Sequence, residues 1–292
     1  MRKDDNFIML PTVDFCFAGL MENARVRKGF LAAVMRVSPE KIKETVLLPT
    51  ILRRESGDGK LGILDVRVVM EDGTQVDIEM QVAYFEHWDK RVLFYLSRIY
   101  AGQLRKGEPY DKLKKCIHVS ILDFVYFPND TECCRTIHFR DDKTGEIYTD
   151  LMEIQILELK KLPKEVKSSE DVLAWMKFFS GKTKKEFEDM AKTNEYIGEA
   201  YNALLELSAD EKRRLEYEAR EKALKDYNSQ MESAFKRGEE QGERRGEERG
   251  EIRGIEKTRE VFRLHGQGKQ PGEIAGLCGM TENEVEWVLF GD

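Results

Sequence analysis

The amino-acid sequence predicts an α/β fold: a mixed central sheet flanked by helices and followed by a helical C-terminal extension. Two hairpin patterns, at 63–82 and 135–160, place apolar runs on either side of turn-rich centres. Between them, 86–105 predicts a helix because it lacks proline, and 116–124 is β-rich with the length of a strand. A helix between two strands indicates a crossover connection and therefore a mixed sheet.

The length and composition predict a globular protein with more than one part. Its 292 residues suffice for one large domain with an appendage or for two small domains. Hydrophobic residues make up 41% and charged residues 35%, which fits a core with a heavily solvated surface or a charged extension. The net charge of −7 lacks the basic excess that would point to nucleic acid, but a local basic patch stays open.

The sequence also predicts a compartment and argues against a zinc site. No apolar run approaches the roughly 20 residues that span a bilayer, and 1–10 lacks the apolar core of a secretory signal, so we expect a cytoplasmic protein. The four histidines are too far apart for zinc-ligand spacing. Scattered cysteines, odd in number, are expected to be structural thiols: Cys16, Cys116, Cys133, Cys134 and Cys278.

The N-terminal part predicts a helix over 10–35, where apolar residues recur at helical spacing, with Thr12 or Asp14 as its N-cap. The following segment, 36–60, predicts a short helix and a polar loop. That loop ends in RRESGDGK, whose glycines and aspartate mark a turn.

From Ser168 onward the pattern is helical, and a low-complexity repeat interrupts it. We predict a core at 1–165, a helical extension at 166–235, a Gly/Glu/Arg-rich helical linker at 236–257 and a small helical module at 258–292. The linker carries glycine at every fourth position, at Gly238, Gly242, Gly246, Gly250 and Gly254. Each glycine costs a helix about 0.5–1 kcal/mol relative to alanine. The stripe is therefore either a solvated mixed-charge tether or a close contact between helices.

The C-terminal module predicts three short helices, the last beginning with a capping box at Thr281 and Glu284. The stretch PGEIAGLCGMTENEVEWVL resembles the two-helix core of a helix-turn-helix motif. Its second helix is acidic, whereas a helix that reads the major groove usually carries Arg, Asn or Gln. A small oligomerisation or capping module is the alternative interpretation.

The first hairpin contains two carboxylates in otherwise apolar strands. If 71–73 (EDG) forms a three-residue loop with its glycine in the left-handed region, the register places Asp65 directly opposite Glu79, with Gln81 on the same face. A two-residue turn would instead send Asp65 and Glu79 to opposite faces. Two buried like charges repel each other unless something pairs with them.

A divalent cation would remove this repulsion. Mg²⁺ prefers oxygen ligands, often one or two carboxylates with water and substrate phosphate. Such an ion polarises a phosphodiester and activates a water, and the Gln81 amide could orient that water or hold a phosphate oxygen. The alternative is a cross-strand pair without metal, satisfied by water or by Arg67 or Arg91.

The order of these elements resembles the PD-(D/E)XK nuclease core, and more closely the recombination-promoting nuclease (Rpn) family, often described as PD-(D/E)XK nuclease family transposases. VDFCFAGLM resembles the family's N-terminal D-F-x-F-K-x-L-F helix, and GILDVRVVMEDGTQVDIEMQV resembles its D…(V/I)-(D/N)-I-E-x-Q core. RVLFYLSRIYAGQL resembles its R-x-x-x-Y-x-S-x-x-Y-x-x-Q helix, and IHVSILDF and ILELKKLP resemble its later strands. The resemblance covers 10–165 well and the helical tail loosely.

The resemblance implies a restriction-endonuclease-like core that cleaves DNA with Mg²⁺, for which Mn²⁺ can substitute, in recombination or mobile-element biology. It assigns Asp65 and Glu79 as metal ligands and catalytic residues. Gln81 takes the place of the motif lysine as a third catalytic residue. Ala18 stands where the family often has lysine, so a catalytically inactive DNA-binding, protein-binding or oligomerisation protein is the alternative function.

Four further positions match the family motifs and are expected to support the site: Asp14, Arg91, Tyr95 and Gln103. Asp14 is equally consistent with a plain helix cap. Arg91 and Tyr95 form an i, i+4 pair that could face the scissile phosphate, or Tyr95 is a core aromatic. DNA is the expected partner, with no membrane. Because cutting both strands of a duplex usually needs two sites, we also expect a homodimer through the C-terminal helical region.

Overall fold

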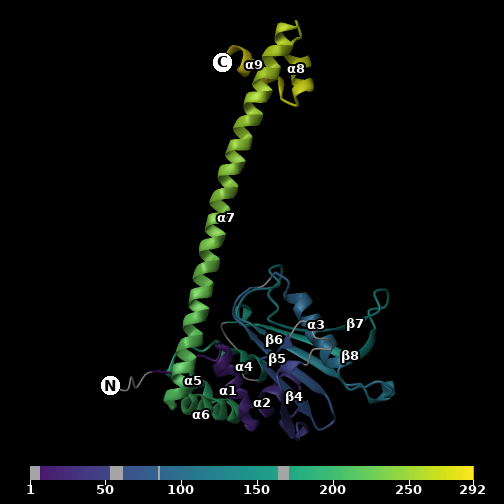
Figure 1. Ribbon diagram of the computed structural model, residues 1–292, viewed down its shortest axis with the longest axis vertical. Coiled ribbons are helices and arrows are strands. Elements are labelled where there is room, and N and C mark those ends of the chain that lie inside the picture. Colours follow the sequence, from purple (N-terminus) through teal and green to yellow (C-terminus); the bar gives the residue numbers. More distant parts are fainter. Residues whose placement is uncertain (1–6, 53–61, 85, 164–170, 292) are drawn as a thin grey trace. The chain divides into compact units, whose positions relative to one another are not determined.

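The computed structural model describes residues 7–52, 62–84, 86–163 and 171–291 (Figure 1). They divide into two compact units, one ending at Leu224 and the other beginning at Lys225. The predicted boundary at 165/166 and the predicted turn RRESGDGK lie outside the described residues. None of the described helices combines the length and the apolar character that crossing a membrane requires.

A mixed sheet forms the centre of the first unit, as predicted. Its described strands number six and follow the order β1-β4-β5-β6-β8-β7. They are β1 (Thr45–Leu48), β4 (Val66–Met70), β5 (Gln75–Gln81), β6 (Cys116–Leu122), β7 (Cys134–Arg140) and β8 (Ile147–Glu158). β5, β6 and β8 run parallel, whereas the other neighbours pair antiparallel. A separate short ladder joins β2 (Ile51–Leu52) to β3 (Gly62–Ile63).

The connections between these strands confirm both predicted motifs. α3 (Trp88–Ala101) crosses from β5 to β6, which is why these two strands can run parallel. β7 and β8 form the second hairpin, whose ladder becomes irregular after His138. The two crossovers place the carboxyl ends of β5, β6 and β8 at the same edge of the sheet.

The first hairpin has the predicted three-residue loop. Gly73 has a φ of +87°, in the left-handed region that favours glycine. The Met70 N–H donates to the Thr74 carbonyl at 2.9 Å, which closes the loop. The ladder between β4 and β5 keeps this register, and its continuation by one pair places Asp65 opposite Glu79. The predicted register is therefore confirmed.

Side chains alternate along β5 between two environments. Val76, Ile78 and Met80 join the main hydrophobic core. That core is completed by α1 (Asp14–Glu22), α2 (Ala24–Met35), α4 (Asp171–Ser180), α5 (Lys184–Ala191) and α6 (Glu195–Ala209). Asp77 and Glu79 are buried on the other face, where α3 packs against β6. In Figure 1, α3 lies on one side of the sheet and α1, α2 and α4 lie on the other.

The predicted single helix over 10–35 is two helices, because Asn23 interrupts it. Asn23 is extended, and its side chain caps α2 by accepting from two backbone N–H groups of the next turn. The N-cap of α1 is Val13, which provides no side-chain cap, so neither Thr12 nor Asp14 has the predicted capping position. Asp14 is the first helical residue, where a negative charge favours the helix dipole.

The segment 36–60 differs from its prediction in a similar way. A 3-10 turn at Pro39–Lys41 replaces the predicted short helix, and β1 follows it. β1 lies at the edge of the sheet, and its side chains do not alternate between buried and exposed. The period-two signal that identifies a strand is therefore absent from its sequence.

α7 (Glu211–Gly266) begins in the first unit and continues into the second. It includes the predicted linker and the first of the three short helices predicted for the C-terminal module, so that part of the prediction was wrong. α8 (Pro271–Cys278) and α9 (Glu282–Phe290) are the other two, and the capping box at Thr281 and Glu284 is confirmed. A small apolar core joins them to the end of α7: Val261, Leu264, Ile274, Ala275 and Val285.

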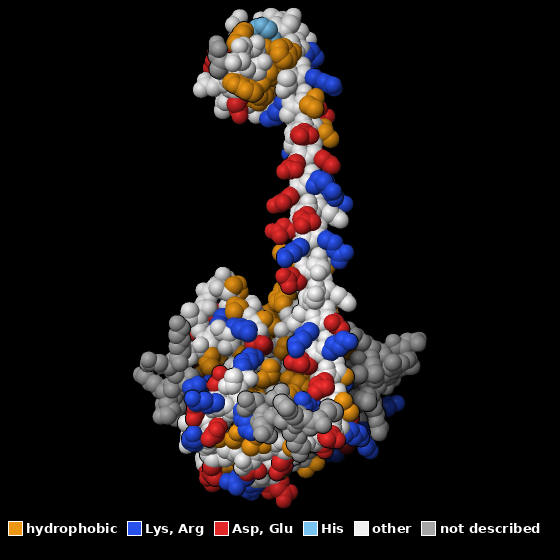
Figure 2. Space-filling view, turned by 90° about the vertical axis from the view of Figure 1, so that its left-hand side faces the viewer, with side chains coloured by type: hydrophobic (Ala, Val, Ile, Leu, Met, Phe, Trp, Pro, Cys, Tyr) orange, Lys and Arg blue, Asp and Glu red, His pale blue; other side chains and the backbone are white. Residues whose placement is uncertain are grey.

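The glycine stripe of α7 is solvated within this chain. A Cβ added at any of its glycines, from Gly238 to Gly254, would meet no atom of the described chain within 4 Å. Figure 2 shows acidic and basic side chains next to each other along this stretch of the helix. The tether interpretation fits this arrangement, and a close helix contact along the stripe would need a second chain.

Candidate active site

Asp65 and Glu79 come together where β4 begins and β5 approaches its end. The Met80 N–H donates to Asp65 Oδ2 at 2.9 Å, which fixes this side chain against β5. Glu79 is 1% exposed and lies on the α3 face of the sheet, whereas Asp65 is half-buried. The hairpin thus holds two carboxylates side by side at one end of its ladder.

Within the described residues, two side chains contact the Glu79 carboxylate. Arg91, on α3, places Nη2 3.2 Å from Glu79 Oε2. Gln81 donates from Nε2 to the same oxygen at 3.3 Å. Arg67 instead donates to Gln75 Oε1 at 2.7 Å. Of the two arginines that the metal-free alternative names, Arg91 therefore reaches the site.

Burial raises the pKa of both carboxyls. Desolvation is the main reason that the pKa of Asp65 rises to about 6, and the charges of Asp14 and Asp77 add to the rise while Arg91 opposes it. Desolvation likewise raises the pKa of Glu79 to about 7, with a contribution from Asp77. At neutral pH, the full negative charge of this pair therefore depends on positive charge nearby.

Within the described chain, one buried carboxylate oxygen of the site lacks a partner that carries a positive charge or donates a hydrogen bond. Glu79 Oε1 is buried and has no hydrogen-bond partner among the described residues, although such groups are costly to leave unpaired. Two carboxylates beside an amide are the hard oxygen donors that Mg²⁺ takes. No group of three His, Cys, Asp or Glu side chains suited to a metal forms within the described ranges, so water and substrate oxygens would complete the shell. The residues present fit Mg²⁺ on those terms.

A buried polar line that the sequence did not predict lies beside Glu79. His118 on β6 is fully buried, and its Nδ1 lies 2.6 Å from Asp77 Oδ2 and its Nε2 2.7 Å from Ser120 Oγ. Ser120 is the register partner of Glu79 across the parallel ladder. Burial lowers the pKa of His118, but the charge and hydrogen bond of Asp77 raise it more, so the net shift is upward.

The sequence contains a signal for this line. Asp77 and Glu79 alternate on β5, and His118 and Ser120 alternate on β6, so each pair occupies one face of an otherwise apolar strand. Two polar stripes of this kind on neighbouring strands favour a buried network. Only the pairing of β5 with β6 brings them together, and that pairing is not local in sequence.

Asp14 and Arg91 act on the carboxylates, and Tyr95 contacts Arg91. The charge of Asp14 acts on Asp65, and Asp14 Oδ2 also lies 3.3 Å from Arg220 Nη1. Tyr95 is 7% exposed and belongs to the core beneath α3. The Arg91 guanidinium lies 5.3 Å from the centre of its ring. Tyr95 is thus a core aromatic that supports Arg91.

Gln103 is not brought to the site. It follows α3, and its side-chain amide makes hydrogen bonds to the backbone of Lys114, at 2.9 Å to the carbonyl and 2.8 Å to the N–H. It also contacts Cys116 Sγ at 3.1 Å. Cys116 is the register partner of Gln75, four residues along β5 from Glu79, which is roughly 13 Å for a strand. The structure therefore gives Gln103 a role in fixing the start of β6.

The carboxyl ends of the parallel strands meet beside Gln81. The Asp123 N–H donates to the Gln81 carbonyl at 2.8 Å, which joins the end of β6 to the end of β5. Glu158, fully buried at the end of β8, accepts from the N–H groups of Tyr126 and Phe127 at 2.7 and 3.1 Å. Open α/β sheets usually bind ligands outside the carboxyl ends of their parallel strands.

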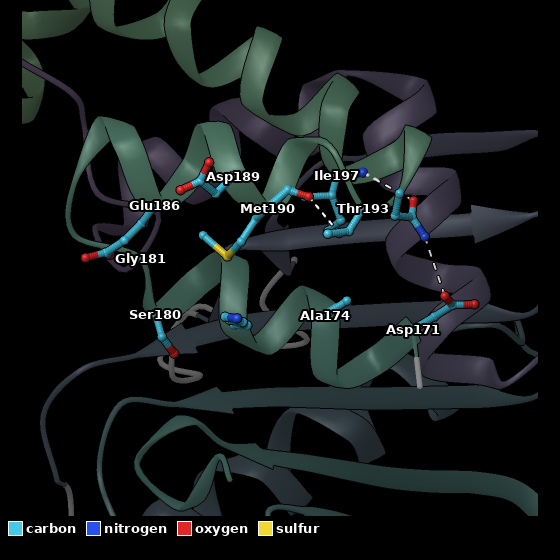
Figure 3. Close-up of a pocket in the computed structure, with 11 residues that line it drawn as sticks. Asp171, Ala174, Ser180, Gly181, Glu186, Asp189, Met190, Thr193 and Ile197 are labelled. Carbon is cyan, nitrogen blue, oxygen red and sulfur yellow. Dashed lines mark hydrogen bonds between the residues drawn. The ribbon is translucent and has the colours of Figure 1, made fainter. Parts of the chain in front are cut away.

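A cavity of about 540 Å³ lies elsewhere, among α4, α5 and α6. Figure 3 shows Asp171, Glu186 and Asp189 around it, with Met190 and Thr193. These helices cover the face of the sheet opposite to Glu79, so this cavity is separate from the carboxylate pair.

Comparison with known proteins gives one match. A family model described as PD-(D/E)XK nuclease family transposase matches residues 11–234, which is more than half of the chain. The matched region contains all the residues of the carboxylate site and ends before the glycine stripe. No curated protein and no solved structure matches the chain.

Proposed function

The chain belongs to the PD-(D/E)XK nuclease family transposases, and from this premise we propose that it is a Mg²⁺-dependent DNA endonuclease that hydrolyses phosphodiester bonds in recombination or mobile-element biology. The observation that carries the proposal is the buried Glu79 beside Asp65, with one carboxylate oxygen lacking a partner in the described chain. Family membership supports nuclease chemistry, and the carboxylate pair supports the proposal that a metal ion binds there.

Each site residue has a role in this proposal. Asp65 and Glu79 would hold the ion, and Mn²⁺ would substitute because it accepts the same oxygen ligands. When bound, the ion stabilises charge on the phosphodiester and lowers the pKa of a bound water. Gln81 orients the attacking water or a phosphate oxygen through its amide. Arg91, about one-third exposed, can pair with a phosphate as well as with Glu79.

The direct test is cleavage of plasmid DNA with Mg²⁺ or Mn²⁺ by the full chain. Asp65→Asn and Glu79→Gln should each reduce the rate by more than the roughly 10–100-fold that loss of an outer-shell partner costs a metal site. Glu71→Gln is the matched control, because Glu71 is an exposed carboxylate of the same hairpin that pairs with Lys43. Equal cleavage by wild type and both site variants would refute the assignment.

A second candidate function follows from the Arg91–Glu79 ion pair. If Arg91 permanently replaces the metal, the chain is an inactive descendant that binds DNA or protein, and alanine at position 18 fits that reading. Calorimetric titration separates the two functions. The nuclease should bind Mn²⁺ in a manner that Asp65→Asn abolishes, whereas the inactive descendant should show no such binding.

DNA is the substrate in this proposal, and the C-terminal helical region is where a homodimer would form. The solvated stripe on α7 leaves that helix without a partner along this stretch of the described chain. Sedimentation of the full chain beside a truncation ending near Leu224 tests the dimer directly. A dimer that survives the truncation would place the contact in the first unit.

A further inference from the structure

Aromatic side chains gather at the carboxyl ends of β5 and β6. Tyr84 follows β5, and Phe124 and Tyr126 follow β6. The Tyr84 ring centre lies 5.8 Å from that of Phe124 and 6.4 Å from that of Tyr126. Phe127 continues the group, with its ring centre 5.0 Å from that of Tyr126. We call these four residues the aromatic rim.

Contacts with Trp88, Glu158 and Arg135 hold the aromatic rim in place. Trp88, at the start of α3, is buried, and its ring centre lies 4.6 Å from that of Tyr126. Glu158 fixes the backbone of Tyr126 and Phe127 through two hydrogen bonds. The Arg135 guanidinium lies 4.3 Å from the centre of the Phe127 ring. These contacts make the rim a prearranged surface, which lowers the entropy cost of binding.

Tyr84 remains 58% exposed although it touches this cluster. It is three residues from Gln81, so at most about 11 Å of chain separates them. The link from Asp123 to Gln81 brings the other half of the rim to the same edge. An aromatic surface with Tyr84 exposed and the other three rings partly exposed therefore borders the end of β5, two residues beyond Glu79.

We propose that the aromatic rim stacks an unpaired base of the nucleic acid, so that the chain prefers DNA with unpaired bases to continuous duplex. The inference rests on the proposed function and names its substrate class: single strands, flaps and bubbles. In a duplex the faces of the bases are covered by their neighbours, and an aromatic ring reaches them only where a base is unpaired or turned out.

Charged side chains near the rim are consistent with a nucleic acid backbone passing there. Arg91 lies at Glu79, and Lys160 reaches the same edge through its ion pair with Asp123 at 3.0 Å. Both cations are at least one-third exposed, so they can contact phosphate groups. A protein partner would also cover an exposed tyrosine, but the position of the rim beside Gln81 favours the substrate.

The test compares the binding of two fluorescent DNAs by the full chain, in buffer with EDTA so that no cleavage occurs. One is an oligothymidine and the other is a duplex of mixed sequence and the same length. Fluorescence anisotropy should show tighter binding of the oligothymidine. Tyr84→Ala should weaken that binding between about 5-fold and 150-fold, the range for loss of one base stack. Tyr84→Trp should retain it.

Tyr110→Ala is the matched control, because Tyr110 is 83% exposed and lies before β6, at the opposite end of the strands. It should leave both affinities unchanged. A parallel assay with Mg²⁺ compares cleavage of a bubble substrate with cleavage of the duplex. If Tyr84→Ala alters neither the oligothymidine affinity nor the cleavage ratio, the rim does not contact bases and the inference is overturned.

The outcomes also separate this inference from the proposed function. Binding of oligothymidine that depends on Tyr84, without any cleavage, supports the base contact and refutes the nuclease. Cleavage of duplex and bubble at equal rates, unaffected by Tyr84→Ala, supports the nuclease and refutes the base contact. Capture of a protein that needs Tyr84, with unchanged DNA binding, likewise overturns the inference.

Discussion

The guanidinium of Arg91 lies 3.2 Å from one carboxylate oxygen of Glu79, while the other oxygen of Glu79 has no partner in the described chain. Arg91, on α3, therefore contacts one oxygen of this buried carboxylate, and the other oxygen remains available to a ligand. This asymmetry is what a site needs if its ligand brings positive charge of its own. The contributions of Arg91, of Glu79 and of their neighbours can therefore be measured separately by substitution.

Replacing Arg91 should destabilise the protein in a way that Mg²⁺ partly reverses. Arg91→Ala leaves Glu79 buried without its cation, and we expect a loss of about 1–3 kcal/mol in the free energy of unfolding, since Arg91 is partly solvated. Added Mg²⁺ should recover part of the loss. Urea denaturation measures both effects, with Lys90→Ala as the exposed control on the same helix. An unchanged midpoint for Arg91→Ala would show that the ion pair contributes nothing.

The carboxylate pair should make Mg²⁺ affinity rise with pH. The ligands must lose their protons to bind, and the pKa values of Asp65 and Glu79 are raised to about 6 and about 7. Calorimetry should therefore show weak binding below pH 6 and an affinity that continues to rise through pH 7. The Asp65→Asn, Glu79→Gln double variant should show no Mg²⁺ binding at any pH. Affinity that stays constant across the interval would contradict the raised pKa values.

Without added Mg²⁺, the same two carboxyls should make the protein less stable as pH rises. A carboxyl whose pKa is raised by folding binds more protons in the folded state, so its stabilising contribution is complete below the unfolded pKa near 4 and is lost as pH rises through 6 to 7. The wild type should therefore lose stability relative to the double variant, whose amide side chains do not titrate, as pH rises through that interval. Guanidinium denaturation at several pH values measures it.

The buried line of Asp77, His118 and Ser120 should show strong coupling. His118→Leu leaves the Asp77 carboxylate unpaired in the core, and we expect a loss of about 3–5 kcal/mol, the usual cost of breaking a buried ion pair. The Asp77→Leu, His118→Leu double variant removes both charges and should cost clearly less than the sum of the singles. Additive losses in denaturant unfolding would mean that the pair is not coupled.

Gly73 sets the hairpin register and should not tolerate a side chain. Its φ of +87° strains other residues, and a Cβ there would lie 2.9 Å from Lys114 Cγ. Gly73→Ala should cost at least 1 kcal/mol, of the order usual for a left-handed position. Gly107→Ala is the comparison, because Gly107 has φ +91° and open space around it. Equal thermal shifts for the two variants would show that the Lys114 contact is unimportant.

Local patterns made the hairpin and its carboxylates predictable. The EDG loop and the alternation on either side of it fix the register of Asp65 and Glu79 without any distant contact. The i, i+4 relation between Arg91 and Tyr95 is likewise local to one helix. These features depend on residues within one element or one turn, which is the range over which sequence periodicity carries information.

Features that depend on distant contacts were not predictable. His118 meets Asp77 only because β5 and β6 become neighbours through a crossover. Gln103 matches a family motif, but it lies just past the end of α3, so its side chain turns to the start of β6. Asn23 splits the first helix because its side chain competes for backbone N–H groups, an effect that apolar spacing does not reveal.

The long run of α7 has a thermodynamic consequence for the chain as a whole. Its five spaced glycines each weaken the helix by about 0.5–1 kcal/mol, and no packing within the described chain offsets that loss. Two parts of a chain unfold together when contacts link them. Among the residues that the structure describes, the stretch of α7 from Gly238 to Gly254 contributes only its own helical hydrogen bonds. We therefore expect the two units to unfold as separate cooperative blocks, so that a destabilising substitution in the C-terminal unit leaves the unfolding free energy of the nuclease-like core unchanged.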